Sequence, residues 1–141
     1  MITIKVLSSS DLPLLMNAAD GVFDNRVNEK YASEFLADPR HHIVVALSEG
    51  VVIGFASAIH YIHPDKAPEL WIDEVGVAPT YQNQGAGKAI MNELLSLGKQ
   101  LGCGTAWVLT DRSNEAANKL YKAAGGQVAD GDTVMYEFEV D

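Results

Sequence analysis

Glycines and amide side chains gather after an apolar stretch that ends at Pro79, where they could bind a phosphate group. The run reads, in order, Gln82, Asn83, Gln84, Gly85, Ala86, Gly87 and Lys88. A helical pattern starts directly after it, so its amides belong to a helix N-terminus. Such N–H groups have no partner within the helix and lie at the positive end of its dipole. Glycines let an anion approach them closely, so the run is predicted to bind a pyrophosphate.

Two common phosphate loops do not fit this run. A Walker A loop needs a glycine five positions before its Gly-Lys pair and a Ser or Thr after it, but Gln82 and Ala89 occupy those positions. A dinucleotide fingerprint orders its glycines as Gly-x-Gly-x-x-Gly near the start of a βαβ unit, and this run lies past the middle of the chain. The alternative is that Gly85 and Gly87 only form a tight turn.

Two adjacent carboxylates, Asp73 and Glu74, lie just before Gly76 in the preceding apolar stretch. Strand alternation directs neighbouring side chains to opposite faces, so we expect only one of the two to reach a shared site. A glycine inside a strand often marks a bulge or a close backbone approach. The four histidines and Cys103 follow no metal-ligand spacing, so no metal site is predicted.

These residues are positioned by alternating strand and helix patterns. The expected strands are residues 2–7, 42–48, 51–61, 69–78, 105–110, which we expect to be buried, and 134–140, with a further short strand near Gln127. The expected helices cover residues 11–20, 28–38, the stretch after Gly87 and the stretch from 113 or 114 to 124. This order predicts an α/β (α+β) fold with one mixed sheet covered by helices.

Bulk properties narrow the class of protein. The length of 141 residues fits one domain, and no apolar run is long enough to span a membrane. The net charge of −9 makes a nucleic-acid partner unexpected, because such proteins present a basic surface. The single cysteine and the absence of a signal-peptide pattern lead us to expect a cytoplasmic protein.

Two motifs resemble a known family. Residues 82–87 resemble the Gln/Arg-x-x-Gly-x-Gly/Ala motif of the GNAT acyl-CoA N-acyltransferases, and residues 75–79 resemble the central strand before it. Residues 114–125 resemble the family's Asn-x-x-Ala-x-x-Leu-Tyr-x-x-x-Gly helix. The order of elements fits across nearly the whole chain. Gly126 departs from the pattern, because the family usually has Phe or another bulky residue there.

The resemblance implies a fold and an assembly. It implies a single acetyltransferase domain over residues 1–141. Its mixed, mostly antiparallel sheet would have six to seven strands, about four helices and a splayed central pair of parallel strands. Family members are often dimers, which implies a homodimer. A weaker resemblance to aminoglycoside 3-N-acetyltransferases rests on residues 70–77 and 134–139.

The resemblance also implies acetyl-CoA as the cosubstrate and a primary amine as the acceptor. The amides of the run from Gln82 to Lys88 would then bind the pyrophosphate, and the pantetheine would lie in the gap between the splayed strands. The N–H of Val75 would face the thioester oxygen. The remaining residues implied in cofactor binding are Gly76, Val77, Asn114, Ala117 and Tyr121.

Catalysis would need a base, because an alkyl ammonium is almost fully protonated at pH 7. Glu74 is favoured for that role and Asp73 is the alternative. Either would need a raised pKa or a water relay. Tyr121 matches the family's tyrosine that faces the departing sulfur, where it would act as an acid or only as a hydrogen-bond donor.

The predicted function is therefore N-acetyl transfer by direct reaction in a ternary complex. The expected acceptor is a small cationic amine, such as an aminoglycoside or a polyamine, or else a peptide amine. The alternative is a non-catalytic acyl-CoA-binding regulatory or sensor module. Such a module would need neither Tyr121 nor the acidic pair, so their presence favours an enzyme.

Overall fold

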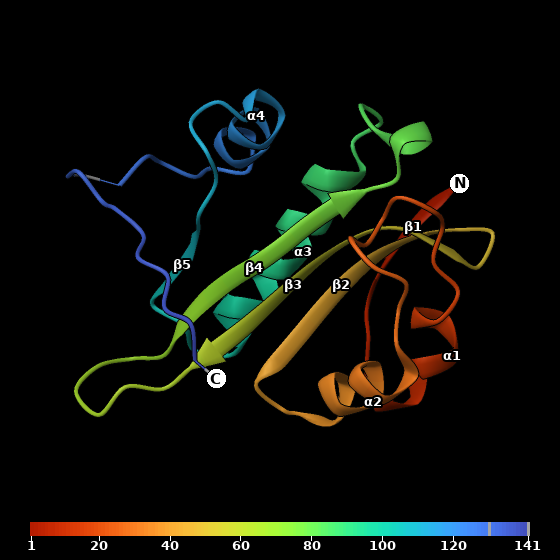
Figure 1. The fold of residues 1–141 in the computed structure, drawn as a ribbon, viewed down its shortest axis with the longest axis horizontal. Helices are drawn as coiled ribbons and strands as arrows, with labels where there is room; N and C mark the ends of the chain where they lie inside the picture. Colours follow the sequence, from red (N-terminus) through yellow and green to blue (C-terminus); the bar gives the residue numbers. More distant parts are fainter. Residues whose placement is uncertain (130, 141) are drawn as a thin grey trace.

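A five-stranded sheet with helices on both faces forms the centre of the molecule (Figure 1). The computed structural model describes residues 1–129 and 131–140. The strands are β1 (Ile2–Val6), β2 (His41–Ser48), β3 (Val51–Tyr61), β4 (Glu69–Val77) and β5 (Thr105–Val108). The helices are η1 (Ser9–Asp11), α1 (Leu12–Leu15), α2 (Glu29–Ala37), η2 (Pro79–Tyr81), α3 (Ala86–Gln100) and α4 (Glu115–Ala123).

The strands lie in the order of the sequence. β1 to β4 pair antiparallel with their neighbours, and β5 pairs parallel to β4. Glu49 and Gly50 join β2 to β3, and both have positive φ angles, 51° and 78°, as a two-residue hairpin loop of the primed type requires. The predicted mixed, mostly antiparallel sheet is confirmed.

Two hydrophobic cores lie on opposite faces of the sheet. Alternate residues of β2 point to different cores, with Val44 in one and Val45 in the other. The first core packs against α3, whose Ile90 and Leu94 are fully buried. The second core packs against α1 and α2 and contains Leu15 and residues of β2 and β3. Figure 1 shows α3 behind β3 and β4, and α1 and α2 close together beside β2.

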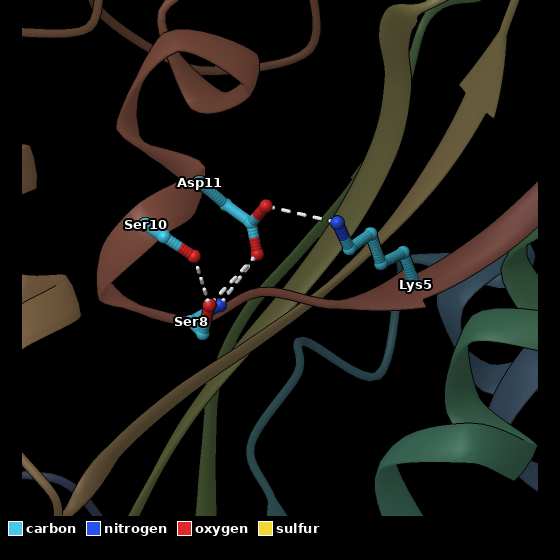
Figure 2. A network of polar contacts seen from close by, with 4 residues as sticks. All are labelled: Lys5, Ser8, Ser10 and Asp11. Atoms are coloured by element: carbon cyan, nitrogen blue, oxygen red, sulfur yellow. Dashed lines mark hydrogen bonds and ion pairs between the residues drawn. The ribbon is translucent and has the colours of Figure 1, made fainter.

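The first helical segment is shorter than the predicted helix over residues 11–20. It begins at Ser8, whose N–H donates to the Asp11 carboxylate at 2.8 Å, while Lys5 Nζ donates to the same group at 2.8 Å (Figure 2). The Lys5 hydrogen bond is the largest cause that lowers the pKa of Asp11. The helix ends early because residues 17–19 pair with β3 instead, through Ala19 N to Val52 O at 2.9 Å.

The C-terminal end of α4 explains the unusual glycine at position 126. Gly125 has a φ of 98°. Its N–H donates to Lys122 O at 3.0 Å, and the N–H of Gly126 donates to Tyr121 O at 2.8 Å. These two bonds form a Schellman motif. A Cβ at Gly126 would lie only 2.9 Å from Tyr121 O, so a larger residue would not fit this turn.

The structure corrects the prediction of strands after α4. Residues 134–140 form no strand with the described part of the chain, and Phe138 is 84% exposed. No strand lies near Gln127 either, so the described sheet has five strands instead of six to seven. β5 is therefore an edge strand of only four residues and is not buried as predicted, with Trp107 40% exposed. The alternating pattern of residues 134–140 is typical of a strand, but a strand is not stable without a partner strand to pair with.

Candidate active site

The loop before α3 adopts a conformation that only a few residue types allow. Asn83 and Gly85 both have positive φ angles, 62° and 84°. Gly85 is the N-cap of α3 in the left-handed conformation, which glycine adopts without a steric penalty. Two glutamine side chains hold the loop, since Gln82 Nε2 donates to Val77 O at 3.1 Å and Gln84 Nε2 donates to Thr80 O at 3.2 Å. The sequence did not predict that the side chains of Gln82 and Gln84 hold the loop through these hydrogen bonds.

The start of α3 presents free amides to this loop. The N–H of Ala89 donates to Gly85 O at 3.1 Å, so the amides of residues 86–88 have no carbonyl partner within the helix. Gly87 has a separate role, because a Cβ there would lie 3.3 Å from the Leu120 side chain of α4. Gly85 is thus required by the backbone conformation, and Gly87 is required by the packing of α3 against α4. Pyrophosphate binding by residues 82–88 stays a prediction.

One extra residue in β4 changes the register beside the acidic pair. Ser57 of β3 pairs with Glu74, but the next residue, Ala58, pairs with Ile72, so Asp73 is a bulge. The bulge lies three positions before Gly76, the residue that the sequence offered as the mark of a bulge or a close backbone approach. Gly76 itself pairs regularly with Phe55.

The bulge places both carboxylates on the same face of the sheet, which corrects the expectation of opposite faces. Ile72 and Val75 both pack into the core beneath α3. Asp73 Oδ1 accepts a hydrogen bond from Trp71 Nε1 at 3.3 Å, and Trp71 alternates with Ile72. Asp73 and Glu74 therefore both point to the face that α1 and α2 cover. A classic bulge has this effect because two residues oppose one on the partner strand.

β4 and β5 separate toward the candidate site, as the predicted splay requires. β5 pairs only with residues Glu69–Ile72 of β4, and Figure 1 shows it diverging from β4 toward α4. Ala78 N donates to Ile53 O at 2.8 Å across the β3 side. Alternate residues of a strand direct their amides to the same side. Val75 and Val77 are out of phase with Ala78, so their amides face the β5 side. These amides lie where the two strands separate.

A pocket of about 340 Å³ opens on the face that carries Glu74. Its floor is the sheet, its roof is the loop 23–28 with α2, and α1 contributes one side chain. The lining residues are Leu15, Phe23, Asp24, Asn25, Arg26, Val27, Asn28, Tyr31, Ala32, Phe35, Ile43, Phe55, Ser57 and Glu74. A second hollow of about 370 Å³ beside α1 is lined by none of the predicted site residues. The pocket on the sheet is therefore the candidate acceptor site.

Glu74 has an unusual electrostatic environment in this pocket. Partial burial is the largest cause that raises the pKa of its carboxyl group, and the negative charges of Asp73 and Asp24 raise it further. A carboxyl group with a raised pKa is a better base near neutral pH than an ordinary one. Sequence reasoning anticipated Glu74 and Asp73 but not Asp24, which no motif marks.

Gly76 lets the roof of the pocket approach the floor. A Cβ at this position would lie 2.6 Å from Val22 O and 3.1 Å from the Phe55 ring. The next residue in the loop, Phe23, stacks on Phe55 with the ring centroids 4.1 Å apart. The glycine therefore marks a close backbone approach rather than a bulge, and this approach positions one wall of the pocket.

Tyr121 and Asn114 lie on α4, beyond the point where β5 leaves β4. Tyr121 is half-buried against the core beneath α3, and burial raises the pKa of its phenol. The hydroxyl therefore stays protonated at neutral pH and is a donor. Asn114 Oδ1 accepts from the N–H of Ala117 at 3.1 Å and caps the helix. Cofactor contacts of these three residues stay predictions.

The histidines do not join this site. His42 Nε2 and His60 Nδ1 lie 2.7 Å apart, next to each other on β2 and β3, and burial with the neighbouring His60 lowers the pKa of His42 to about 4. None of the four histidines lines the pocket. Among residues 1–129 and 131–140, no three His, Cys, Asp or Glu side chains are grouped as metal ligands. No helix in these ranges is long and apolar enough to cross a bilayer.

Comparison with known proteins identifies the family of the chain. Residues 12–125 match the model of the acetyltransferase (GNAT) family. An uncharacterized N-acetyltransferase of Mycobacterium bovis is 27% identical over 105 residues, which cover 74% of this chain and 65% of that protein. The N-alpha-acetyltransferase RimI of Mycobacterium tuberculosis is 33% identical over 92 residues, 65% of this chain and 56% of RimI. The chain spans less than two thirds of the length of either relative.

Solved structures share the fold across the whole chain. The aminoglycoside N-acetyltransferase AAC(6')-Iy, in complex with the bisubstrate analogue CoA-S-monomethyl-acetylneamine, superposes with a TM-score of 0.80. The superposition covers 99% of this chain and 99% of that one, at 19% identity. At this level of identity the likeness shows the fold alone.

We expect Gly76→Ala to destabilise the protein and to deform the pocket. The added methyl group would meet the Val22 carbonyl, and overpacking of this kind costs about 1–3 kcal/mol. Gly104→Ala is the matched control, because its Cβ would lie 3.8 Å from the nearest side chain, that of Ala67. Chemical denaturation measures both. Equal stability of the two variants would contradict the close approach at Gly76.

We also expect Glu74→Gln to stabilise the fold at pH 7. The pKa of this carboxyl group is higher in the folded than in the unfolded state. The protein therefore loses stability as the pH rises from the unfolded-state pKa through the folded-state pKa, because the folded state disfavours the charged form. The neutral amide removes this loss, so the variant should melt at a higher temperature than the wild type at pH 7. The difference in melting temperature should disappear at pH 4, where the carboxyl group is largely protonated in both the folded and the unfolded state. A lower melting temperature of the variant at pH 7 would contradict the assignment.

Proposed function

We propose that this chain, which belongs to the GNAT acetyltransferase family, transfers an acetyl group from acetyl-CoA to a primary amine held in the pocket beside Glu74. The observation that carries the proposal is the position of this carboxylate. It lies at the pocket on one side of β4, in the part of the strand where β5 has already separated from it. Acceptor and donor could therefore meet at the same stretch of β4.

The donor side is supported by the free amides at the start of α3. We propose that the amides of residues 86–88 bind the pyrophosphate of acetyl-CoA, with the exposed Lys88 adding a positive charge. The amide of Val75 is directed toward the side where the strands separate. In that place it would donate to the thioester oxygen as negative charge develops there, which is how an oxyanion-hole donor accelerates acyl transfer.

The acceptor side needs proton removal. We propose that Glu74, with its raised pKa, takes a proton from the ammonium group either directly or through water. The neutral amine then attacks the thioester carbonyl carbon and forms the new C–N bond. The nitrogen loses its second proton as the C–S bond breaks, and the departing thiolate of CoA takes up a proton. Tyr121, which keeps its proton because of its raised pKa, donates a hydrogen bond to the departing sulfur. Asp73 and Asp24 favour the cationic acceptor by their charge.

A small cationic amine is the proposed acceptor, the class that includes aminoglycosides and polyamines. A pocket of about 340 Å³ lined in part by Asp24 and Glu74 supports a small molecule of positive charge. A peptide N-terminal amine is the second candidate, because the relative with 33% identity is an N-alpha-acetyltransferase. A binding module without catalysis would have no use for a carboxylate with a raised pKa in the acceptor pocket.

Release of free thiol from acetyl-CoA tests the proposal directly. The full chain is incubated with acetyl-CoA and a panel of amines that contains a polyamine, an aminoglycoside, simple alkylamines and a short peptide. We expect amine-dependent thiol release that Glu74→Gln lowers at least tenfold while thermal stabilisation by acetyl-CoA persists. Thermal stabilisation by acetyl-CoA without thiol release from any amine would instead favour the non-catalytic binding module.

We expect Tyr121→Phe to lower turnover at least tenfold while the affinity for CoA holds. The substitution removes only the hydroxyl and keeps the ring that packs against the core. Tyr136→Phe makes the same chemical change at a side chain that is highly exposed in the C-terminal segment, so it serves as the control. Steady-state kinetics and CoA titration measure the two effects. An unchanged turnover in Tyr121→Phe would remove this tyrosine from the mechanism.

A further inference from the structure

The pocket has one acidic side. Glu74 lies on β4, and the charges of Asp73 and Asp24 are close enough to act on it. Among the described residues that line the pocket, Asp24 and Glu74 are the carboxylates and Arg26 is the cation. An ammonium group therefore finds opposite charge at the Glu74 side, where the proposed reaction takes place.

The floor of the pocket becomes apolar with distance from β4. Glu74, Ser57 and Ile43 are paired in one row across β4, β3 and β2. Neighbouring strands lie about 4.8 Å apart, so Ile43 lies about 10 Å from Glu74 across the floor. Ile43 is only 3% exposed, and Ser57, between them, is 7% exposed. The floor thus changes from a carboxylate to a hydroxyl to a buried aliphatic side chain.

The walls above the far end of this row are also apolar. Phe35 and Ala32 of α2 and Leu15 of α1 belong to the same hydrophobic core as Ile43, and all of them line the pocket. No side chain of this group accepts a hydrogen bond. A charged group placed there would lose its hydration without gaining a partner, which is strongly unfavourable. An alkyl or aryl group would be buried favourably instead.

We propose that this pocket selects primary amines with a single ammonium group at one end and an apolar body at the other, and disfavours amines with a second positive charge on that body. The inference rests on the proposed function, because it takes the Glu74 side as the place of reaction. It narrows the class of cationic amines to monoamines. Polyamines and aminoglycosides carry further charges that the apolar end cannot pair, and Arg26 repels them as well.

Two amines of equal size test whether the pocket prefers a monoamine to a diamine. Hexylamine and 1,5-diaminopentane have the same number of non-hydrogen atoms, and each presents a primary ammonium. They differ in the far end of the chain, which is a methyl group in one and a second ammonium in the other. We expect the kcat/KM of hexylamine, measured by thiol release from acetyl-CoA with the full chain, to exceed that of 1,5-diaminopentane at least tenfold. Kanamycin is included as a polycation and should be the poorest acceptor.

A carboxylate introduced at the apolar end should reverse this preference. Phe35→Asp places the charge on the α2 wall, and Phe35→Leu is the matched control that keeps the wall apolar. Because Phe35 packs in the core, a thermal melt must show that the Asp variant folds. Tyr31→Asp provides a second variant on the same helix at a side chain that is 69% exposed and lines the pocket. We expect the diamine to gain at least tenfold relative to hexylamine in a folded Asp variant.

The outcomes separate this inference from the proposed function. If 1,5-diaminopentane or kanamycin is acetylated by the wild type as well as hexylamine or better, the inference is wrong and the acetyl transfer itself stands. A ratio of the two amines that stays unchanged in both folded Asp variants would also overturn it. If no amine at all is acetylated, the proposed function fails and the inference fails with it.

Discussion

The bulge at Asp73 is the constraint on which the arrangement of the site depends. Side chains in a strand alternate with a period of two, so a single extra residue exchanges the faces of every residue after it. Before the bulge, Leu70 and Ile72 point into the core beneath α3. After it, Val75 points there, and Glu74 is left free to line the pocket on the other face. If Asp73 were paired as a regular strand residue, alternation from Ile72 would point Glu74 into the apolar core, where its charge would have no partner.

The same stretch of β4 serves two different surfaces. Its side chains on one face line the floor of the candidate acceptor pocket, while β5 pairs with its other edge only as far as Ile72. On that edge, Val77 O accepts a hydrogen bond from Gln82 Nε2. A strand that lacks a neighbour normally exposes free amides, and a ligand can use them. The divergence of β5 therefore turns an edge of the sheet into a place where the backbone and a cosubstrate can pair. The loop clamped by Gln82 and Gln84 lies at the end of this edge.

The pocket gathers negative charges around Glu74. Glu74 is exposed, but desolvation at the sheet and the charges of Asp73 and Asp24 raise the pKa of its carboxyl group. Such unfavourable electrostatics is typical of residues whose pKa must suit proton transfer. The stacked pair Phe23 and Phe55 holds the loop that carries Asp24 over Gly76.

Sequence alone determined the features that depend on neighbouring residues. The helix that follows the glycine run, the start of the last helix at residue 113 or 114 and the break between the strands at residues 49 and 50 depend on local patterns, and each was predicted. Register, faces and pairing were decided only by tertiary structure. Pairing of residues 17–19 with Val52 shortened the first helix. The bulge formed at Asp73 and not at Gly76, and residues 134–140 formed no strand in the described sheet. The physical reason is that backbone hydrogen bonds between distant strands and the packing of two cores set these features, and no local pattern encodes them.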